Sequence, residues 1–125
     1  VLDGDIVVNL LPLTAATKGF LAAPLFSRMK PGAALVNLAR GAHLVEADLL
    51  AALDDGQLSH AVLDVFETEP LPAGHPFWSH PKVTVMPHVA AITDPASASI
   101  RIAANIRRFR AGEPLEGAVS LDAGY

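Results

Sequence analysis

The sequence has 125 residues, of which 51% are hydrophobic and 18% charged, and its formal net charge is −4. This composition is typical of one folded domain, or a large piece of one, with an apolar core. The lack of a dense Lys/Arg run argues against a nucleic-acid surface, and the absence of cysteine excludes disulfides and thiol nucleophiles. No apolar run approaches the roughly 20 residues of a membrane-spanning helix. We therefore expect a cytoplasmic protein with neither a nucleic-acid nor a membrane partner.

Apolar segments that end at turn signals alternate with helical patterns along the chain. We expect strands at residues 5–10, 34–41, 59–66 and 82–86, the last three of them buried. Helical turns or helices are expected at 15–19, 23–28 and 45–53, and from the Asp94-Pro95 start to about residue 110, before Gly112. This alternation indicates an α/β fold with a mostly parallel sheet. Residues 67–81 leave no room for a crossover helix, so that connection is expected to differ.

Three of the expected strands carry an ionisable group at or beyond their C-terminal ends, the edge where open parallel sheets bind ligands. These groups are Arg40, then Asp64 and Glu69, then His88. Taken alone, Arg40 could pair with a surface acid, and His88 could be satisfied by loop backbone. Glu69, like its neighbour Glu67, could be a solvated loop acid. Asp64 differs from these, because an unpaired buried carboxylate is costly and needs a partner.

An arginine, a carboxylate and a histidine together suit the reduction of a 2-oxo acid to a 2-hydroxy acid. The guanidinium of Arg40 can bind the carboxylate and polarise the neighbouring carbonyl. The imidazole of His88 can protonate the carbonyl oxygen as hydride reaches the carbon, and Glu69 can orient that ring. The hydride requires a nicotinamide cofactor, because no side chain supplies one. The other histidines show no metal-ligand spacing, so we expect no metal site and a structural role for each. They are His43, His60, His75 and His80.

Five motifs, in this order, resemble the C-terminal half of the D-isomer-specific 2-hydroxyacid dehydrogenases over essentially the whole chain. They are LLPLTAATKGFL, RMKPGAALVN, NLARG, LDVFETEPLP and MPHVAAITDP. The wording PHVAAITDP, with HPFW before it and a Gly-Tyr end, is most similar to the branch of this family that reduces glyoxylate and hydroxypyruvate.

The resemblance implies part of a Rossmann-like doubly wound parallel sheet, the C-terminal half of a coenzyme domain, followed by a crossing helix. Residues 1–92 would be the second half of the NAD(P)-binding domain, and 93–125 the crossing helix and tail of the substrate domain. The cofactor would be NADP or NAD, with NADP favoured by the branch, the substrate a small 2-oxo acid, and the enzyme a homodimer. The implied catalytic residues are Arg40, Glu69 and His88. The implied cofactor-lining residues are Leu11, Pro12, Thr17, Leu38, Ala39, Arg40, Asp64, His88, Ala90 and Ala91.

The sequence departs from the family pattern because it contains no G-x-G-x-x-G turn for the cofactor phosphates. We therefore expect the 125-residue chain alone to bind dinucleotide weakly and to turn over little or nothing. Two other functions stay open. One is a reductase for a different D-2-hydroxy acid such as phosphoglycerate, and the other is a nucleotide-sensing module of the same fold without turnover.

Overall fold

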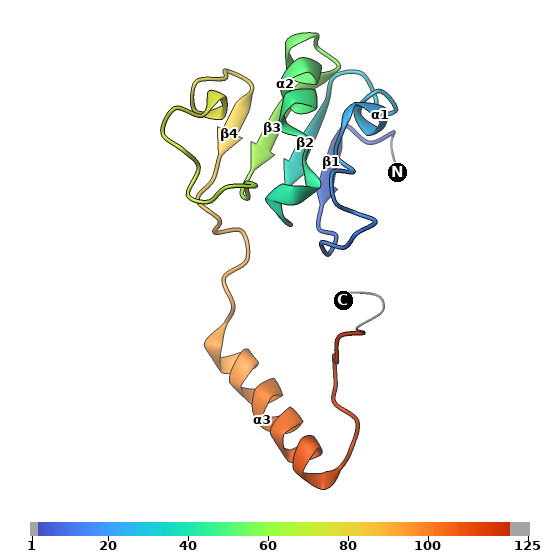
Figure 1. The fold of residues 1–125 in the computed structure, drawn as a ribbon, viewed down its shortest axis with the longest axis vertical. Helices are drawn as coiled ribbons and strands as arrows, with labels where there is room; N and C mark the ends of the chain where they lie inside the picture. The colour runs from blue at the N-terminus through green and yellow to red at the C-terminus, as the bar shows by residue number, and fades with distance from the viewer. Residues whose placement is uncertain (1–2, 121–125) are drawn as a thin grey trace. The chain divides into compact units, whose positions relative to one another are not determined.

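The computed structural model describes residues 3–120 (Figure 1). The chain separates into two compact units, Val1–Ala90 and Ala91–Tyr125. The assignment of residues 1–92 and 93–125 to two domains of a larger enzyme stays a prediction. The Gly-Tyr end that contributes to the family resemblance lies outside the described residues.

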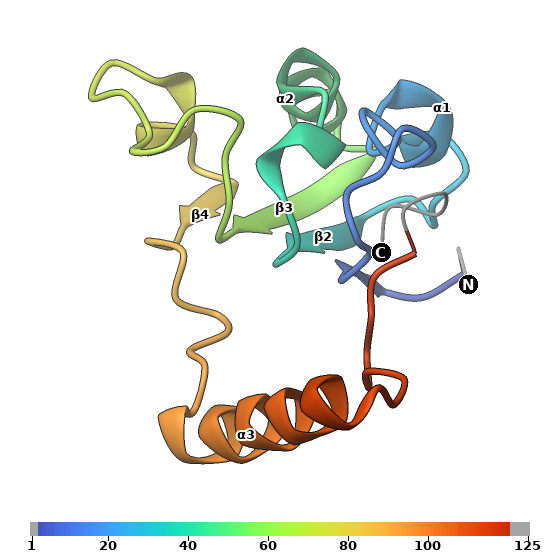
Figure 2. The same cartoon turned by 60° about the horizontal axis from the view of Figure 1, so that its bottom comes forward.

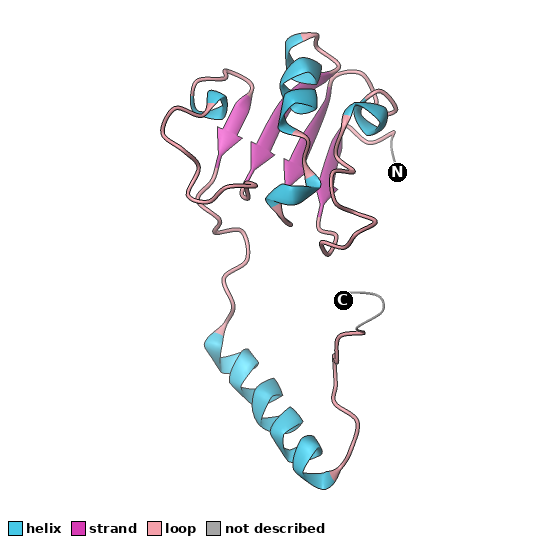
Figure 3. Cartoon of the chain, in the orientation of Figure 1, coloured by secondary structure: helices cyan, strands magenta, loops and turns pink. Residues whose placement is uncertain are grey.

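The first unit is built on a four-stranded sheet in the order β1-β2-β3-β4, with all neighbours parallel (Figure 3). The strands are β1 (Ile6–Asn9), β2 (Ala33–Asn37), β3 (Leu58–Leu63) and β4 (Val83–Val85). Their last residues are register partners: Asn9 lies opposite Asn37, Asn37 opposite Leu63, and Leu63 opposite Val85. The four carboxyl ends therefore form one level edge, and the predicted parallel α/β sheet is confirmed.

The helices α1 (Ala23–Phe26) and α2 (Glu46–Asp54) cover one face of this sheet (Figure 2). Two single 3-10 turns, η1 (Gly41–His43) and η2 (Pro76–Trp78), complete the connections. Because side chains alternate along a strand, every second residue points into the core beneath the helices. The fully buried apolar residues of this core include Phe26, Leu35, Leu49, Leu53, Leu58, Leu63 and Phe77. The side chains of Val8, Val36 and Val62 face the other side and are half-buried or exposed.

All three strands that were predicted to be buried were too long: the one expected at residues 34–41 ends at Asn37, and the last one is also less buried than expected. The segment expected at residues 59–66 leaves the sheet after Leu63, and β4 has only three residues, with Val83 and Val85 half-buried and Thr84 exposed. The last strand is less buried because β4 lies at the edge of the sheet and has one neighbour. Composition does not distinguish an edge strand from a central one. The connection from β3 to β4 contains only η2, as the sequence predicted.

The second unit contains α3 (Pro95–Ala111). Its start is confirmed, because the Asp94 carboxylate accepts hydrogen bonds from the backbone N–H groups of Ala96 and Ser97. Its end is confirmed at Gly112, whose φ of 71° is the left-handed conformation that glycine adopts at a helix C-terminus. The apolar stripe of this helix, including Ile102, Ile106 and Phe109, is exposed. Within residues 3–120, no helix has the length and apolar character that crossing a membrane requires.

Candidate active site

The loop after β2 lies directly against the loop after β3, and Gly41 makes this approach possible. A Cβ atom at position 41 would lie 1.8 Å from the carbonyl carbon of Phe66 and 2.3 Å from the backbone nitrogen of Glu67. Only a residue without a Cβ fits there, so glycine follows Arg40 for a steric reason. This contact brings the Arg40 loop beside the loop that carries Glu69.

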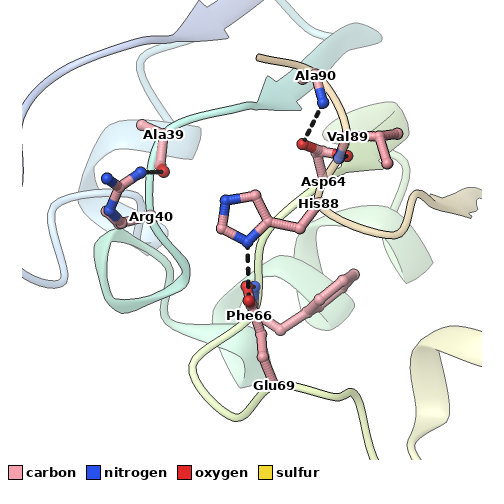
Figure 4. Close-up of polar contacts among 8 residues, drawn as sticks. All are labelled: Ala39, Arg40, Asp64, Phe66, Glu69, His88, Val89 and Ala90. Atoms are coloured by element: carbon pink, nitrogen blue, oxygen red, sulfur yellow. Dashed lines mark hydrogen bonds and ion pairs between the residues drawn. The ribbon is translucent and has the colours of Figure 1, made fainter. Parts of the chain in front are cut away.

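Glu69 is held at both carboxylate oxygens (Figure 4). Oε1 accepts a hydrogen bond of 2.9 Å from the backbone N–H of Phe66, and Oε2 accepts one of 2.8 Å from Nδ1 of His88. The hydrogen bond from His88, and then that from Phe66, lower the pKa of the Glu69 carboxyl below its ordinary value. The neighbouring Glu67 is exposed and has no place in this pair. The structure thus brings Glu69, and not Glu67, to His88.

Asp64 fixes the backbone on which His88 stands. This carboxylate is only 2% exposed, and it accepts hydrogen bonds of 2.8 Å from Val89 N–H and 2.9 Å from Ala90 N–H. His88 has a φ of 56°, a left-handed conformation that costs a non-glycine residue about 1–2 kcal/mol. Hydrogen bonds to a charged group stabilise by about 1.5–3 kcal/mol each, so the two bonds to Asp64 outweigh that cost. The partner that this buried carboxylate was expected to need is therefore the turn after His88.

No group among residues 3–120 bonds the second ring nitrogen of His88. Because a carboxylate only accepts hydrogen bonds, Nδ1 carries the proton that points at Glu69. Nε2 is separated from Nδ1 by one ring carbon and points away from Glu69. Figure 4 shows Arg40 on the side of the ring that carries Nε2. The guanidinium of Arg40 is exposed and donates from Nη1 to its neighbour Ala39 O at 2.6 Å. Among residues 3–120 no carboxylate forms an ion pair with it, unlike the surface pairing considered from the sequence.

An apolar pocket of about 640 Å³ opens beside the Glu69–His88 pair. Its walls come from the β3–β4 connection and the end of β4, and they include Phe66, Leu71, Trp78, Met86 and Pro87. These apolar side chains lie beside the hydrogen bond between Glu69 and His88. The structure thus places a proton donor on a partly apolar surface.

The cofactor-lining positions implied by the resemblance follow the carboxyl ends of all four strands, with Asp64 directly after β3. After β1, the carbonyl of Pro12 accepts a 2.8 Å hydrogen bond from the Thr17 hydroxyl, and Leu11 is 48% exposed. After β2, Leu38 N–H donates to Asn9 O at 3.2 Å. Ala90 is bound to Asp64 as described above, whereas Ala91 belongs to the second unit. Leu11, Pro12, Leu38 and Ala39 thus share the carboxyl edge with Arg40, and their role toward a cofactor stays a prediction.

Three buried polar residues near this edge were missed from the sequence. Asn9, Asn37 and His43 are 4%, 0% and 0% exposed, and Asn9 is hydrogen-bonded to both of the others. His43 was expected to be an ordinary structural histidine, and nothing in its local spacing indicated otherwise. The available signal was that Asn9 and Asn37 each close an apolar run, where a parallel sheet places them side by side.

Residues 2–90 match the family model described as "D-isomer specific 2-hydroxyacid dehydrogenase, NAD binding domain". The glyoxylate/hydroxypyruvate reductase A of Serratia proteamaculans is 58% identical over 125 residues, which are 99% of this chain and 40% of that protein. The corresponding protein of Photorhabdus laumondii is 55% identical over 96% of this chain and 38% of its own length. The chain thus spans about 40% of the length of these curated relatives.

Two solved structures have the same fold. A D-isomer-specific 2-hydroxyacid dehydrogenase from Xanthobacter autotrophicus, in complex with NADPH and MES, matches with a TM-score of 0.93 and 46% identity. The match covers 97% of this chain and 50% of that one. An NADPH-dependent glyoxylate/hydroxypyruvate reductase from Sinorhizobium meliloti, with NADP and sulfate, has a TM-score of 0.90 and 44% identity over 97% of this chain and 40% of its own.

Proposed function

The chain belongs to the D-isomer-specific 2-hydroxyacid dehydrogenase family, and we propose that it carries the catalytic residues of an NAD(P)H-dependent 2-oxo-acid reductase. The proposed substrates are glyoxylate and hydroxypyruvate, and the products are the corresponding 2-hydroxy acids. The observation that carries the proposal is the Glu69–His88 hydrogen bond of 2.8 Å, which leaves His88 Nε2 free on the side of Arg40. The relatives that are named glyoxylate/hydroxypyruvate reductase A support the substrate class.

In the proposed reaction, Arg40 binds the substrate carboxylate through its fork of N–H donors and polarises the adjacent carbonyl. A nicotinamide, when bound, supplies the hydride that adds to the carbonyl carbon. The proton on His88 Nε2 moves to the carbonyl oxygen, so the C=O double bond becomes a C–O single bond as the new C–H and O–H bonds form. Before the transfer, the charge of Glu69 stabilises the protonated ring. After it, the imidazole is neutral, and its Nδ1–H stays hydrogen-bonded to Glu69.

The edge that holds the exposed Leu11 and Pro12, with the half-buried Leu38 and the buried Ala39 beside them, fits a cofactor, because it lies at the carboxyl ends of two parallel strands, where dinucleotides bind in such sheets. NADP is favoured over NAD, since structural relatives were solved with NADPH and with NADP. The family resemblance further supports a homodimer in the cytoplasm.

A hybrid enzyme tests this proposal, because the chain alone contains no G-x-G-x-x-G turn. In this hybrid, the present chain replaces the matching 40% of the Serratia relative, from which it differs at fewer than half of its positions. NADPH consumption is followed with glyoxylate, hydroxypyruvate and a phosphorylated 2-oxo acid. We expect turnover of the first two, and loss of about 10²–10⁴-fold in kcat for His88→Gln, the range for a general acid.

Two matched control variants make the result specific. His60→Gln alters a half-buried histidine whose ring bonds Thr84, and Glu67→Gln alters the exposed neighbour of Glu69. Both should keep full activity, whereas Glu69→Gln and His88→Gln should not. If only the phosphorylated 2-oxo acid is turned over, the proposed substrates, glyoxylate and hydroxypyruvate, are wrong and a phosphorylated substrate takes their place. Cofactor binding without turnover of any 2-oxo acid would refute the reductase and favour a nucleotide-sensing module.

A further inference from the structure

Three buried polar side chains form a connected cluster beneath the carboxyl edge of the sheet. Asn9 ends β1, Asn37 ends β2, and His43 closes η1. Nδ2 of Asn9 lies 2.9 Å from Oδ1 of Asn37 and 2.8 Å from Nδ1 of His43. Burying three polar side chains is unfavourable unless each polar atom finds a partner, and an apolar trio could pack without this requirement. Their polarity therefore needs an explanation beyond packing.

The direction of every hydrogen bond in the cluster follows from the backbone around it. Leu11 N–H donates at 3.1 Å to the Asn9 side chain, so an oxygen must face it, and the Asn9 NH₂ must face Asn37 and His43. Because this NH₂ donates to Nδ1 of His43, that nitrogen is the acceptor and Nε2 carries the proton. Nε2 then donates to Pro12 O at 3.3 Å.

The same logic orients Asn37. Ala39 N–H donates to Oδ1 of Asn37 at 3.3 Å, and Nδ2 of Asn37 donates to Arg40 O at 3.2 Å. The cluster thus binds four backbone groups of two separate loops. Two of these groups belong to Leu11–Pro12 after β1, and two belong to Ala39–Arg40 after β2.

We propose that Asn9, Asn37 and His43 are positioning residues, which hold the loop after β1 and the loop after β2 in fixed relation to each other. The consequence for catalysis rests on the proposed function, in which the first loop lines the cofactor and the second carries Arg40. Through this cluster the cofactor wall and the substrate anchor share one rigid support. His43 is the member that reaches across, because it starts on the Arg40 side and bonds the carbonyl of Pro12.

The first experiment uses the 125-residue protein and needs no activity. In the unmodified chain, ¹⁵N chemical shifts of the His43 ring should show Nδ1 unprotonated and Nε2 protonated; the opposite tautomer would overturn the proposal. In His43→Leu, hydrogen exchange at Leu11 N–H and Ala39 N–H should accelerate by about tenfold, the effect of losing one buried hydrogen bond, while amides within α2 stay unchanged. A uniform acceleration over the whole sheet would indicate a merely structural role and would also overturn it.

The second experiment uses kinetics in the hybrid enzyme. His43→Leu should raise KM for NADPH and for glyoxylate by about tenfold, with the pH profile of kcat unchanged, because His88 and Glu69 are not altered. His43→Gln should restore most of the loss, since its amide oxygen can accept from Asn9 and its NH₂ can donate to Pro12 O. Unchanged KM in a folded His43→Leu hybrid would overturn the positioning role. An inactive unmodified hybrid would instead refute the proposed function, and the ring tautomer and exchange data would still decide on the cluster.

Discussion

Replacement of Gly41 by alanine should be the most damaging single-methyl change in the first unit. The added Cβ would lie 1.8 Å from the carbonyl carbon of Phe66, about half the 3.4–4 Å of an ordinary van der Waals contact. The atoms that it meets are backbone atoms of Phe66 and Glu67, so no side-chain rotation relieves the clash. One of the two loops must therefore move.

The cost of that movement has two parts. Overpacking of an interior contact costs about 1–3 kcal/mol, and a contact between two backbones lies at the upper end of this range. Displacing Phe66 also weakens its N–H bond to Glu69, and a hydrogen bond to a charged group contributes about 1.5–3 kcal/mol. We expect Gly41→Ala to lower the free energy of unfolding by about 3–5 kcal/mol, a large fraction of a typical stability.

Urea unfolding followed by circular dichroism measures this change against two other glycines. Gly74 has open space around its Cβ position and no positive φ, so Gly74→Ala should be neutral or stabilising by about 0.4–1 kcal/mol. Gly56 also has open space but a φ of 84°, so Gly56→Ala should cost about 1–2 kcal/mol from backbone strain alone. If Gly41→Ala costs no more than Gly56→Ala, the close approach of the two loops is refuted.

Three further predictions concern carboxylates. Asp64→Asn should lower the free energy of unfolding by about 1.5–3 kcal/mol, because its amide cannot accept from both N–H groups after His88; equal stability in urea would contradict this. The pKa of Glu69 is lowered by the hydrogen bond from His88, so the stability that Glu69 adds is present above its unfolded pKa and is lost as pH falls through the folded value. The difference in unfolding free energy between the parent and Glu69→Gln should therefore vanish in acid, and a difference that persists there would count against the pair. The pKa of Asp94 is lowered by the backbone N–H and the hydroxyl of Ser97, so Asp94→Ala should reduce helical circular dichroism at neutral pH more than Asp94→Asn, and any gap between Asp94→Asn and the parent should close in acid, where Asp94 is neutral. Equal signals from the two variants at neutral pH would speak against the cap.

The sheet and the Glu69–His88 pair could be predicted because they follow from local signals. Apolar runs that stop at a charged or proline residue mark strand ends, and parallel strands bring these ends to one edge. The choice of Glu69 over Glu67 came from its place before Pro70 in a family motif, and the structure gives the physical reason. Only Glu69 receives the N–H of Phe66, three residues before it, and so faces His88.

The hydrogen bonds that hold His43 and the close approach of the loops after β2 and β3 could not be predicted. Both depend on pairs of residues that are far apart in the sequence. His43 needs Asn9, which is 34 residues away, and Asn9 needs Asn37, which is 28 residues away. Each of these residues, viewed alone, is ordinary at a strand end or in a turn. Gly41 looks like a turn glycine, but its φ is not positive, and the requirement comes from the backbone of Phe66. Such requirements are visible only when the strands are already paired.

The residues proposed for proton transfer are held more rigidly than the residue proposed to bind the substrate carboxylate. The proton-transfer half is fixed before any substrate binds, because Asp64 holds the turn at His88 and Phe66 holds Glu69. The anion-binding half is less constrained, since the Arg40 guanidinium is exposed and bonds only its neighbour's carbonyl among the contacts described. What the cluster around Asn37 holds is the Arg40 backbone, which leaves the long side chain free to meet a carboxylate. Ordering the Arg40 side chain costs conformational entropy when the substrate binds, whereas His88 is already in place and needs no reorganisation at the moment of proton transfer. Buried polar groups thus fix the backbone on both sides of the site, Asp64 at His88 and Asn37 at Arg40, and only the Arg40 side chain is left for the substrate to order.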